Sequence, residues 1–177
     1  MSAQPTDPAT IRAQLEALHA ESFAWALVCC ADDPAEAEDV LQMTYLKILD
    51  DRARYEGRSA FKTWLLGVIR FTAREQRRRV WWRRRRHTPL DEAGEHATAD
   101  ATPDEAAARS EVVAQVRAAC GRLPERQREV MMLVFDHDLG LDDAAAVMGV
   151  SPGTARKHYQ RGKEQLRAWL GGTFSKP

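Results

Sequence analysis

Two short helical patterns separated by a glycine turn restrict what residues 141–170 can fold into. The first pattern, LDDAAAVM over 141–148, carries small residues where a neighbouring helix could approach closely. Gly149 then suits a left-handed turn, Ser151 suits a helix N-cap, and Pro152 suits the first helical position. The helix that follows has an apolar face formed by Ala155, Tyr159, Gly162, Leu166 and Leu170. The pattern predicts a helix-turn-helix in which the alanines and Gly162 allow its two helices to cross closely.

Cations occupy the other side of the second predicted helix. At about 100° per residue, the side opposite the apolar face holds Lys157, Gln160 and Arg161. Thr154 and Arg156 flank that side. Such a helix can enter a major groove with its first residues at base edges and its cations on phosphates. The alternative is a helical hairpin with a solvated basic face, but the turn, cap and small residues together favour DNA binding.

The rest of the chain also favours helices. Of 177 residues, 44% are hydrophobic and 29% charged, only ten are glycine, and few segments alternate as strands do. Apolar residues recur at helical spacing over 11–29, over 40–48 and from about residue 60 onward. A further helical pattern begins near Ala107, includes Val112 and Val113, and ends at Leu123-Pro124. These patterns predict an all-α protein with two small helical domains.

The net charge is zero, but charges of opposite sign are segregated along the chain. Residues 32–51 hold seven acidic residues and one lysine, whereas residues 74–86 hold eight arginines and one glutamate. Residues 87–106 contain six acidic residues, two prolines and no lysine or arginine, and they lack periodic apolar positions. This segment reads as a flexible acidic connector between the two domains. The blocks suit a protein with one anionic and one basic partner.

Several function classes are disfavoured by the sequence. Three cysteines, two of them adjacent, make a poor disulfide framework and indicate a reducing compartment. Neither a signal peptide nor an apolar run of about 20 residues is apparent, so we expect a cytoplasmic protein without membrane insertion. The five histidines are scattered, and no glycine-rich phosphate loop occurs. We expect no catalytic residue, metal, cofactor or small-molecule substrate.

A second basic surface interleaves aromatic residues with arginines between Tyr55 and Arg79. Aromatic rings can stack on unpaired bases while arginines hold the backbone, which is the chemistry of single-strand binding. A loop before such a helix can also hold an extruded base. The alternative is that Phe61 and Trp64 belong to the core, and helical periodicity favours this for Trp64.

Both surfaces together resemble a known family. AEAEDVLQMTYLKIL resembles the polymerase-binding helix of bacterial sigma-70 factors, and SAFKTWLLGVIRFTAREQRRR resembles their loop and helix for the promoter −10 element. LPERQREVMMLVFDHDLGLDDAAAVMGVSPGTARKHYQRGKEQL resembles sigma region 4, which binds the −35 element. The resemblance is to the extracytoplasmic-function (ECF) group. It implies a region 2-like domain over 10–86, the connector over 87–106 and a region 4-like domain over 107–172, with a disordered N-terminus (1–9) and a tail (173–177).

The resemblance implies a role for particular residues. The residues implied to bind the β′ subunit of core RNA polymerase are Asp39 and Gln42. Those implied for the −10 element are Ser59, Ala60 and Phe61 around a flipped base, Phe71 near it, and Arg70, Arg74, Arg78 and Arg79 along phosphates. Those implied for the −35 element are Ser151, Thr154, Arg156, Lys157 and Arg161. The implied partners are core polymerase (β′ and β), promoter DNA and an anti-sigma protein.

This chain departs from the family pattern at a few positions. Phe71 stands where asparagine is frequent, and its ring could stack on a base instead of forming an amide pocket. Trp81-Trp82 and the arginines at 83–86 exceed the usual pattern and form either a phosphate-binding extension or a disordered basic tail. A self-contained helix-turn-helix regulator remains the alternative function, although it leaves the other basic surface without a role.

Overall fold

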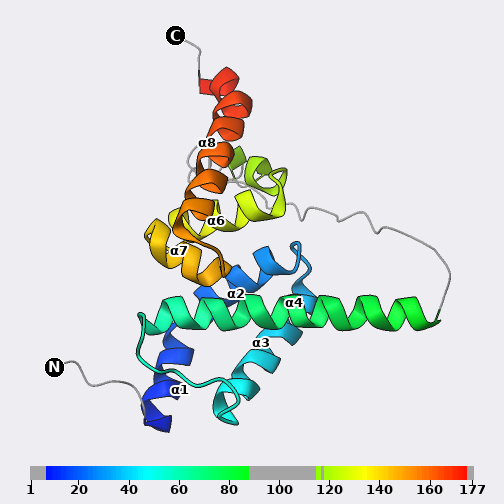
Figure 1. Cartoon of the computed structure of the whole chain (residues 1–177), viewed down its shortest axis with the longest axis vertical. Coiled ribbons are helices and arrows are strands. Elements are labelled where there is room, and N and C mark those ends of the chain that lie inside the picture. The colour runs from blue at the N-terminus through cyan, green and yellow to red at the C-terminus, as the bar shows by residue number, and fades with distance from the viewer. Residues whose placement is uncertain (1–6, 88–114, 117, 175–177) are drawn as a thin grey trace, which may run out of the picture. The chain divides into compact units, whose positions relative to one another are not determined.

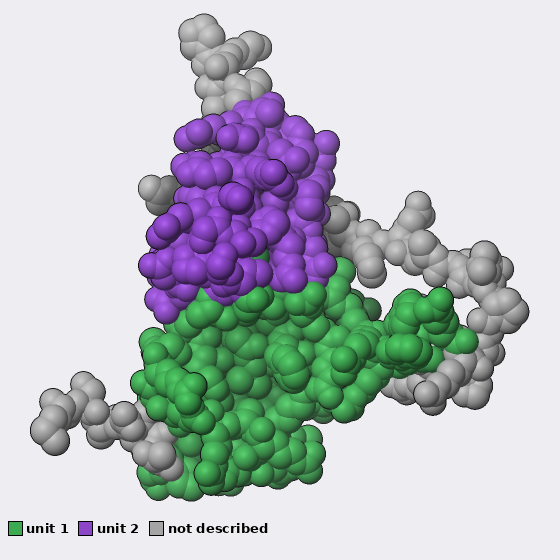
Figure 2. Space-filling view, viewed as in Figure 1, with its two compact units in different colours: residues 1–96, 146–149 green, residues 97–145, 150–177 purple. Residues whose placement is uncertain are grey.

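The computed structural model describes residues 7–87, 115–116 and 118–174, and every regular element among them is a helix (Figure 1). This confirms the all-α prediction. The chain divides into two compact units (Figure 2): residues 1–96 with 146–149, and residues 97–145 with 150–177. The predicted connector lies outside the described residues except for His87, and so do Val112 and Val113 of the predicted helix before Leu123.

The first unit contains four helices: α1 (Pro8–Ala17), α2 (His19–Cys29), α3 (Pro34–Leu49) and α4 (Phe61–His87). The single helix predicted over 11–29 is therefore two helices. Leu18, with φ −97° and ψ 6°, interrupts the helical backbone between them. Periodicity could not reveal this break because both helices keep the same spacing of buried positions, such as Leu15 and Trp25. Pro8 and Ala9 lie in α1, although residues 1–9 were expected to be disordered.

The start of α3 follows from local chemistry. Ala31 and Asp32 take positive φ values of 54° and 64°, which turn the chain after α2. The Asp33 side chain then accepts hydrogen bonds from the backbone N–H groups of Ala35 (3.0 Å) and Glu36 (3.1 Å). Pro34 occupies the first helical turn, where its missing N–H costs nothing. This turn and cap separate α2 from α3, in the gap between the apolar patterns of 11–29 and 40–48.

The core of the first unit forms where α4 packs against α2 and α3. Trp25 of α2 is fully buried, and its indole N–H donates a 3.0 Å hydrogen bond to the carbonyl oxygen of Leu66 in α4. The neighbouring core side chains are Val40, Leu41, Thr44, Ile48, Leu65 and Ile69. They lie within 40–48 and after residue 60, where the sequence predicted apolar residues at helical spacing. One side of α4 is therefore committed to the core, and the opposite side faces solvent.

The second unit contains a helical segment over 118–121, α6 (Glu125–Phe135) and α8 (Pro152–Phe174), which packs against α6. It also contains residues 141–145 of α7 (Leu141–Met148). Pro124 immediately precedes α6, as predicted. The helix α8 continues two residues into the predicted tail, and residues 175–177 lie outside the described part. Buried side chains of the unit include Cys120, Val130, Met131, Leu133 and Ala155.

Gly162 has a different neighbour from the one that the sequence predicted. A Cβ atom on Gly162 would lie 3.1 Å from Cγ and 3.2 Å from Sδ of Met131, which belongs to α6. Gly162 therefore allows the close approach of α8 to α6. Sequence spacing placed Gly162 on the apolar face correctly but could not say which helix covers that face.

We expect Gly162→Leu to lower the free energy of unfolding of the second unit by about 1–3 kcal/mol, because the added side chain overpacks the α6–α8 contact. Gly153→Leu is the matched control in the same helix, since a Cβ built there has no atom within 4 Å apart from its chain neighbours and the backbone of its own helix. Urea unfolding followed by far-UV circular dichroism measures both variants. Equal stabilities of the two variants would contradict the close contact at Gly162.

Candidate nucleic-acid interface

The turn between α7 and α8 has the backbone geometry that its sequence predicted. Gly149 takes φ +62°, in the left-handed region, and the N–H of Val150 donates to the carbonyl of Ala145 at 3.0 Å. Ser151 Oγ accepts a 3.2 Å hydrogen bond from the N–H of Thr154, and the two hydroxyls lie 2.9 Å apart. The left-handed turn and the Ser151 cap are both confirmed. They end α7 and start α8 within three residues.

The predicted −35 residues lie along the outer side of α8. Ser151, Arg156, Lys157 and Arg161 are exposed, and Thr154 is half-buried. Arg156 forms a 3.3 Å ion pair with Asp142 at the start of α7, and both side chains are largely exposed. Within the described residues, Lys157 and Arg161 form no ion pair. This side of α8 therefore presents Lys157 and Arg161 without a paired acid. Arg156 can also bind DNA, because its exposed ion pair with Asp142 is weak and can break.

In the first unit, an aromatic cluster holds the loop that precedes α4. The rings of Tyr55, Phe61 and Trp64 lie with each pair of centroids 5.3 Å apart. The Tyr55 hydroxyl donates to the carbonyl oxygen of Ser59 at 2.5 Å. Phe61 is buried within this cluster, whereas Ser59 is half-buried and Ala60 is exposed. The structure thus places Phe61 as a support for the loop and leaves Ser59 and Ala60 at its surface.

The arginines predicted along α4 do not all share one environment. Arg74, Arg78 and Arg79 are exposed, whereas Arg70 is only 5% exposed. Position 70 lies four residues after Leu66 and three before Ala73, so it shares their buried side of the helix. The expectation that Arg70 lies with the other arginines along an exposed phosphate-binding face therefore does not match its burial. Phe71, by contrast, is 66% exposed.

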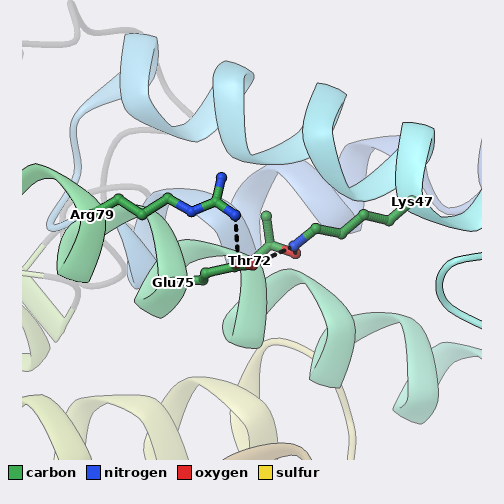
Figure 3. A network of polar contacts seen from close by, with 4 residues as sticks. All are labelled: Lys47, Thr72, Glu75 and Arg79. Carbon is green, nitrogen blue, oxygen red and sulfur yellow. Dashed lines mark hydrogen bonds and ion pairs between the residues drawn. The ribbon is translucent and has the colours of Figure 1, made fainter.

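A polar network joins α3 to α4 (Figure 3). Lys47 Nζ of α3 donates to Thr72 Oγ1 at 3.1 Å and to Glu75 Oε2 at 2.8 Å. Arg79 donates to the other Glu75 oxygen at 2.6 Å. The hydrogen bond from Lys47, followed by the positive charges of Lys47 and Arg79, holds the pKa of Glu75 below its ordinary value of 4.5. Lys47 Nζ also lies 5.6 Å from the centroid of the Phe71 ring.

The two residues predicted to bind polymerase are exposed on α3. Asp39 and Gln42 lie on one side of the helix, and Leu46 and Leu49 continue that side at helical spacing. Leu46 is 59% and Leu49 is 48% exposed. Leu46 and Leu49 were not predicted from the sequence as candidates. Their absence from the inward-facing series that includes Leu41, Thr44 and Ile48 could have revealed them.

Comparison with known families decides what these surfaces belong to. A model described as Sigma-70 region 2 matches residues 18–83, and one described as Sigma-70, region 4 matches residues 114–166. The RNA polymerase sigma factor CarQ of Myxococcus xanthus is 31% identical over 159 residues, which cover 89% of this chain and 87% of CarQ. This chain belongs to the sigma-70 family, in the ECF group.

Other relatives agree with this assignment. The ECF RNA polymerase sigma factor SigX of Bacillus subtilis is 30% identical over 76% of this sigma factor and 71% of SigX. In fold, the chain is similar to the sigma factor RpoE of Bartonella quintana, solved in complex with the anti-sigma factor NepR. That similarity has a TM-score of 0.68 at 21% identity and covers 94% of this chain and 98% of RpoE.

Cys30, which follows α2 directly, is buried. Burial raises the pKa of the Cys30 thiol to about 12, with help from the nearby Glu36 carboxylate, and a thiol of that kind is unreactive. No group of three or more metal-binding side chains occurs among the described residues. Within the same residues, no helix has both the length and the apolar character needed to cross a bilayer.

We expect Glu75→Gln to lower the free energy of unfolding of the first unit by about 1 kcal/mol at neutral pH. Because the folded-state pKa of Glu75 is depressed, its stabilisation is present above the ordinary value of 4.5 and is lost as pH falls through the folded-state pKa. The difference between wild type and Glu75→Gln therefore shrinks below about pH 4.5. Urea unfolding over a series of pH values measures it.

The matched control is Glu16→Gln, which removes an exposed carboxylate from α1 of the same unit. A wild-type to Glu75→Gln difference that stays constant from neutral to acid pH would contradict the proposed importance of the network. So would an equal effect of both substitutions.

Proposed function

We propose that this ECF sigma factor binds core RNA polymerase through its β′ and β subunits, directs it to specific promoters and assists promoter melting. The observation that carries the proposal is the presence, in one chain, of a capped helix-turn-helix with an exposed basic face and a second exposed helix that mixes arginines with aromatic rings. The first is suited to duplex DNA and the second to opened strands. We propose region boundaries of 10–86 and 107–172.

In this proposal the helix α8 reads the −35 element. Ser151 directly precedes α8, and Thr154 and Arg156 lie in its first turns, where a recognition helix approaches base edges. Lys157 and Arg161 follow. Arginine pairs well with guanine and with phosphate, so the side chains can serve either purpose. The exposed ion pair between Arg156 and Asp142 opposes DNA binding only weakly, since exposed pairs contribute little.

The −10 element is assigned to the loop before α4 and to the exposed side of α4. Ser59 and Ala60 lie at the surface of a loop that the Tyr55–Phe61–Trp64 cluster supports, which suits a rigid pocket for an extruded base. Phe71 offers an exposed ring beside Lys47, and Arg74, Arg78 and Arg79 supply cations. The buried Arg70 is left out of the proposed phosphate contacts.

The exposed side of α3 is assigned to core polymerase. Asp39 and Gln42 form its polar part, and the exposed Leu46 and Leu49 add apolar area of the kind that protein interfaces bury. The solved relative RpoE was bound to an anti-sigma factor, and we propose that this chain also has an anti-sigma partner. We place its action in the cytoplasm, with the polymerase that performs the chemistry. The sigma factor itself is not an enzyme in this proposal.

A self-contained helix-turn-helix regulator is not favoured. Sigma-70 region 2 accounts for residues 18–83, a segment for which such a regulator has no use. CarQ and SigX align with 89% and 76% of this chain, which is more than a helix-turn-helix alone would match.

Transcription with core polymerase and genomic DNA fragments, followed by sequencing of transcript starts, tests the function. We expect the added sigma factor to concentrate initiation at discrete promoters. If Arg161 contacts a base, Arg161→Ala should weaken recognition of those promoters by about 1–3 kcal/mol. A phosphate contact would instead weaken all sequences alike and lower the salt dependence. Arg167→Ala, an exposed arginine of the same helix, is the control. Initiation no more selective than with core polymerase alone would refute the function.

We also expect the double substitution Asp39→Ala with Gln42→Ala to weaken binding to core polymerase by about tenfold, through loss of charge and hydrogen bonds at the interface. Arg12→Ala with Glu16→Ala is the control, since it removes two polar side chains, one of them a carboxylate, from exposed positions about one helical turn apart on α1. Fluorescence anisotropy of the labelled sigma factor titrated with core polymerase measures both. Equal affinities of the two double variants would remove α3 from the interface.

A further inference from the structure

An exposed row of aromatic and arginine side chains runs along α4 and continues past the residues assigned to the −10 element. This row, called the α4 strip below, consists of Phe71, Arg74, Arg78, Trp82 and Arg85. Steps of three or four residues keep these side chains on one side of the helix. All five are exposed, and Trp82 is 52% exposed. At a rise of about 1.5 Å per residue, the strip is about 21 Å long.

The carboxyl-terminal part of the strip is a preformed cluster. Trp81, itself 49% exposed, meets Trp82 edge-on, with ring centroids 5.1 Å apart and planes at 82°. The guanidinium carbon of Arg85 lies 4.5 Å from the centroid of the Trp81 ring. These contacts hold the two indoles in place while leaving about half of each exposed. Large apolar rings displayed in this way usually mark a binding surface.

The core of the first unit does not explain these tryptophans. In Figure 1 the carboxyl-terminal end of α4 projects past α2 and α3, the helices that bury its first half. Among the α4 side chains that the structure describes, the last buried ones are Thr72 and Ala73, well before Trp81. Trp81 and Trp82 therefore contribute little to the packing of the first unit, and their exposure indicates a binding partner.

The charge of the strip identifies the class of partner. Within the described residues, Arg74 and Arg78 form no ion pair, whereas Arg79, just off the strip, is paired with Glu75. The strip thus presents uncompensated cations beside open rings. A protein interface usually gathers its aromatic residues in the centre and its charges at the rim. Here rings and cations alternate along a line, which suits a strand whose bases and phosphates alternate.

We propose that the α4 strip binds a single-stranded segment of DNA, with the Trp82 indole stacked on an unpaired base and Arg78 and Arg85 on the flanking phosphates. The inference rests on the proposed function, because unpaired promoter DNA arises when the polymerase opens a promoter. It extends the DNA contact of α4 beyond Arg79 by about 9 Å, from six further residues at the helical rise. Trp81 positions Trp82 and Arg85 through the ring contacts described above.

The test uses the full chain with a fluorescently labelled, mixed-sequence oligonucleotide, single-stranded or annealed as a duplex, and measures anisotropy at low salt. We expect Trp82→Ala to weaken single-strand binding about tenfold and duplex binding much less, since stacking needs an unpaired base. Trp82→Phe, which keeps a ring, should retain most of the affinity. The control Phe135→Ala, which removes a 60% exposed ring from α6, should bind like wild type.

Arg85→Ala provides a second readout. Losing one phosphate contact lowers the slope of log affinity against log salt by about 0.7 for single strands. Arg12→Ala, an exposed arginine of α1, is the control and should leave the slope unchanged. Circular dichroism checks that each variant keeps its helix content.

Three outcomes would overturn the inference: Trp82→Ala binds single strands like wild type, it loses duplex and single-strand binding equally, or it loses affinity for core polymerase instead. If Trp82→Ala does not keep its helix content, Trp82→Phe and Arg85→Ala decide, and an unchanged salt slope for Arg85→Ala then overturns the inference. The proposed function is judged separately, by whether the wild-type chain makes initiation selective. The proposal for the α4 strip can therefore be refuted while the proposed function is supported. The opposite result, in which the strip binds single strands but initiation is not selective, can also be recognised.

Discussion

The packing of α4 against α2 and α3 is the constraint on which the first unit depends. The buried indole of Trp25 donates to the Leu66 carbonyl and so fixes both the rotation of α4 about its axis and its position along α2. Once that rotation is set, helical geometry decides where every other side chain of α4 points. Phe71 and Arg74 face solvent because Leu65 and Ile69 do not. The proposed DNA surface is in this sense a consequence of the core.

The polar network of Lys47, Thr72, Glu75 and Arg79 connects two helices that carry proposed binding surfaces. Lys47 lies on the helix that carries Asp39 and Gln42, and its partner Glu75 lies on the helix that carries the α4 strip. Glu75 divides its two carboxylate oxygens between Lys47 and Arg79. A phosphate that approaches Arg79 must therefore compete with a carboxylate that is already bound, whereas Arg74 and Arg78 carry no such competitor among the described residues. Of these three exposed arginines, Arg74 and Arg78 are better prepared to meet DNA.

What could be predicted from the sequence was decided by local chemistry. The left-handed Gly149 and the Ser151 cap each depend on a few adjacent residues, and both are confirmed. What could not be predicted depends on distant neighbours. The contact of Gly162 with α6 and the burial of Arg70 both result from the way helices pack against one another. Periodicity describes only one helix at a time, so it could not predict either feature. The assignments of residues to promoter DNA and to polymerase stay predictions.

The features of α4 that stability alone does not explain are the ones that point to function. Arg74 and Arg78 stand four residues apart, a spacing at which like charges destabilise a helix by about 0.2–0.5 kcal/mol. Apolar ring surface is also left in contact with water at Phe71, Trp81 and Trp82, where a polar side chain would avoid that cost. A helix optimised only for folding would have neither the like-charged arginine pair nor the exposed aromatic rings. A strand of nucleic acid offsets both costs together, because its phosphates neutralise the arginines while its bases cover the rings.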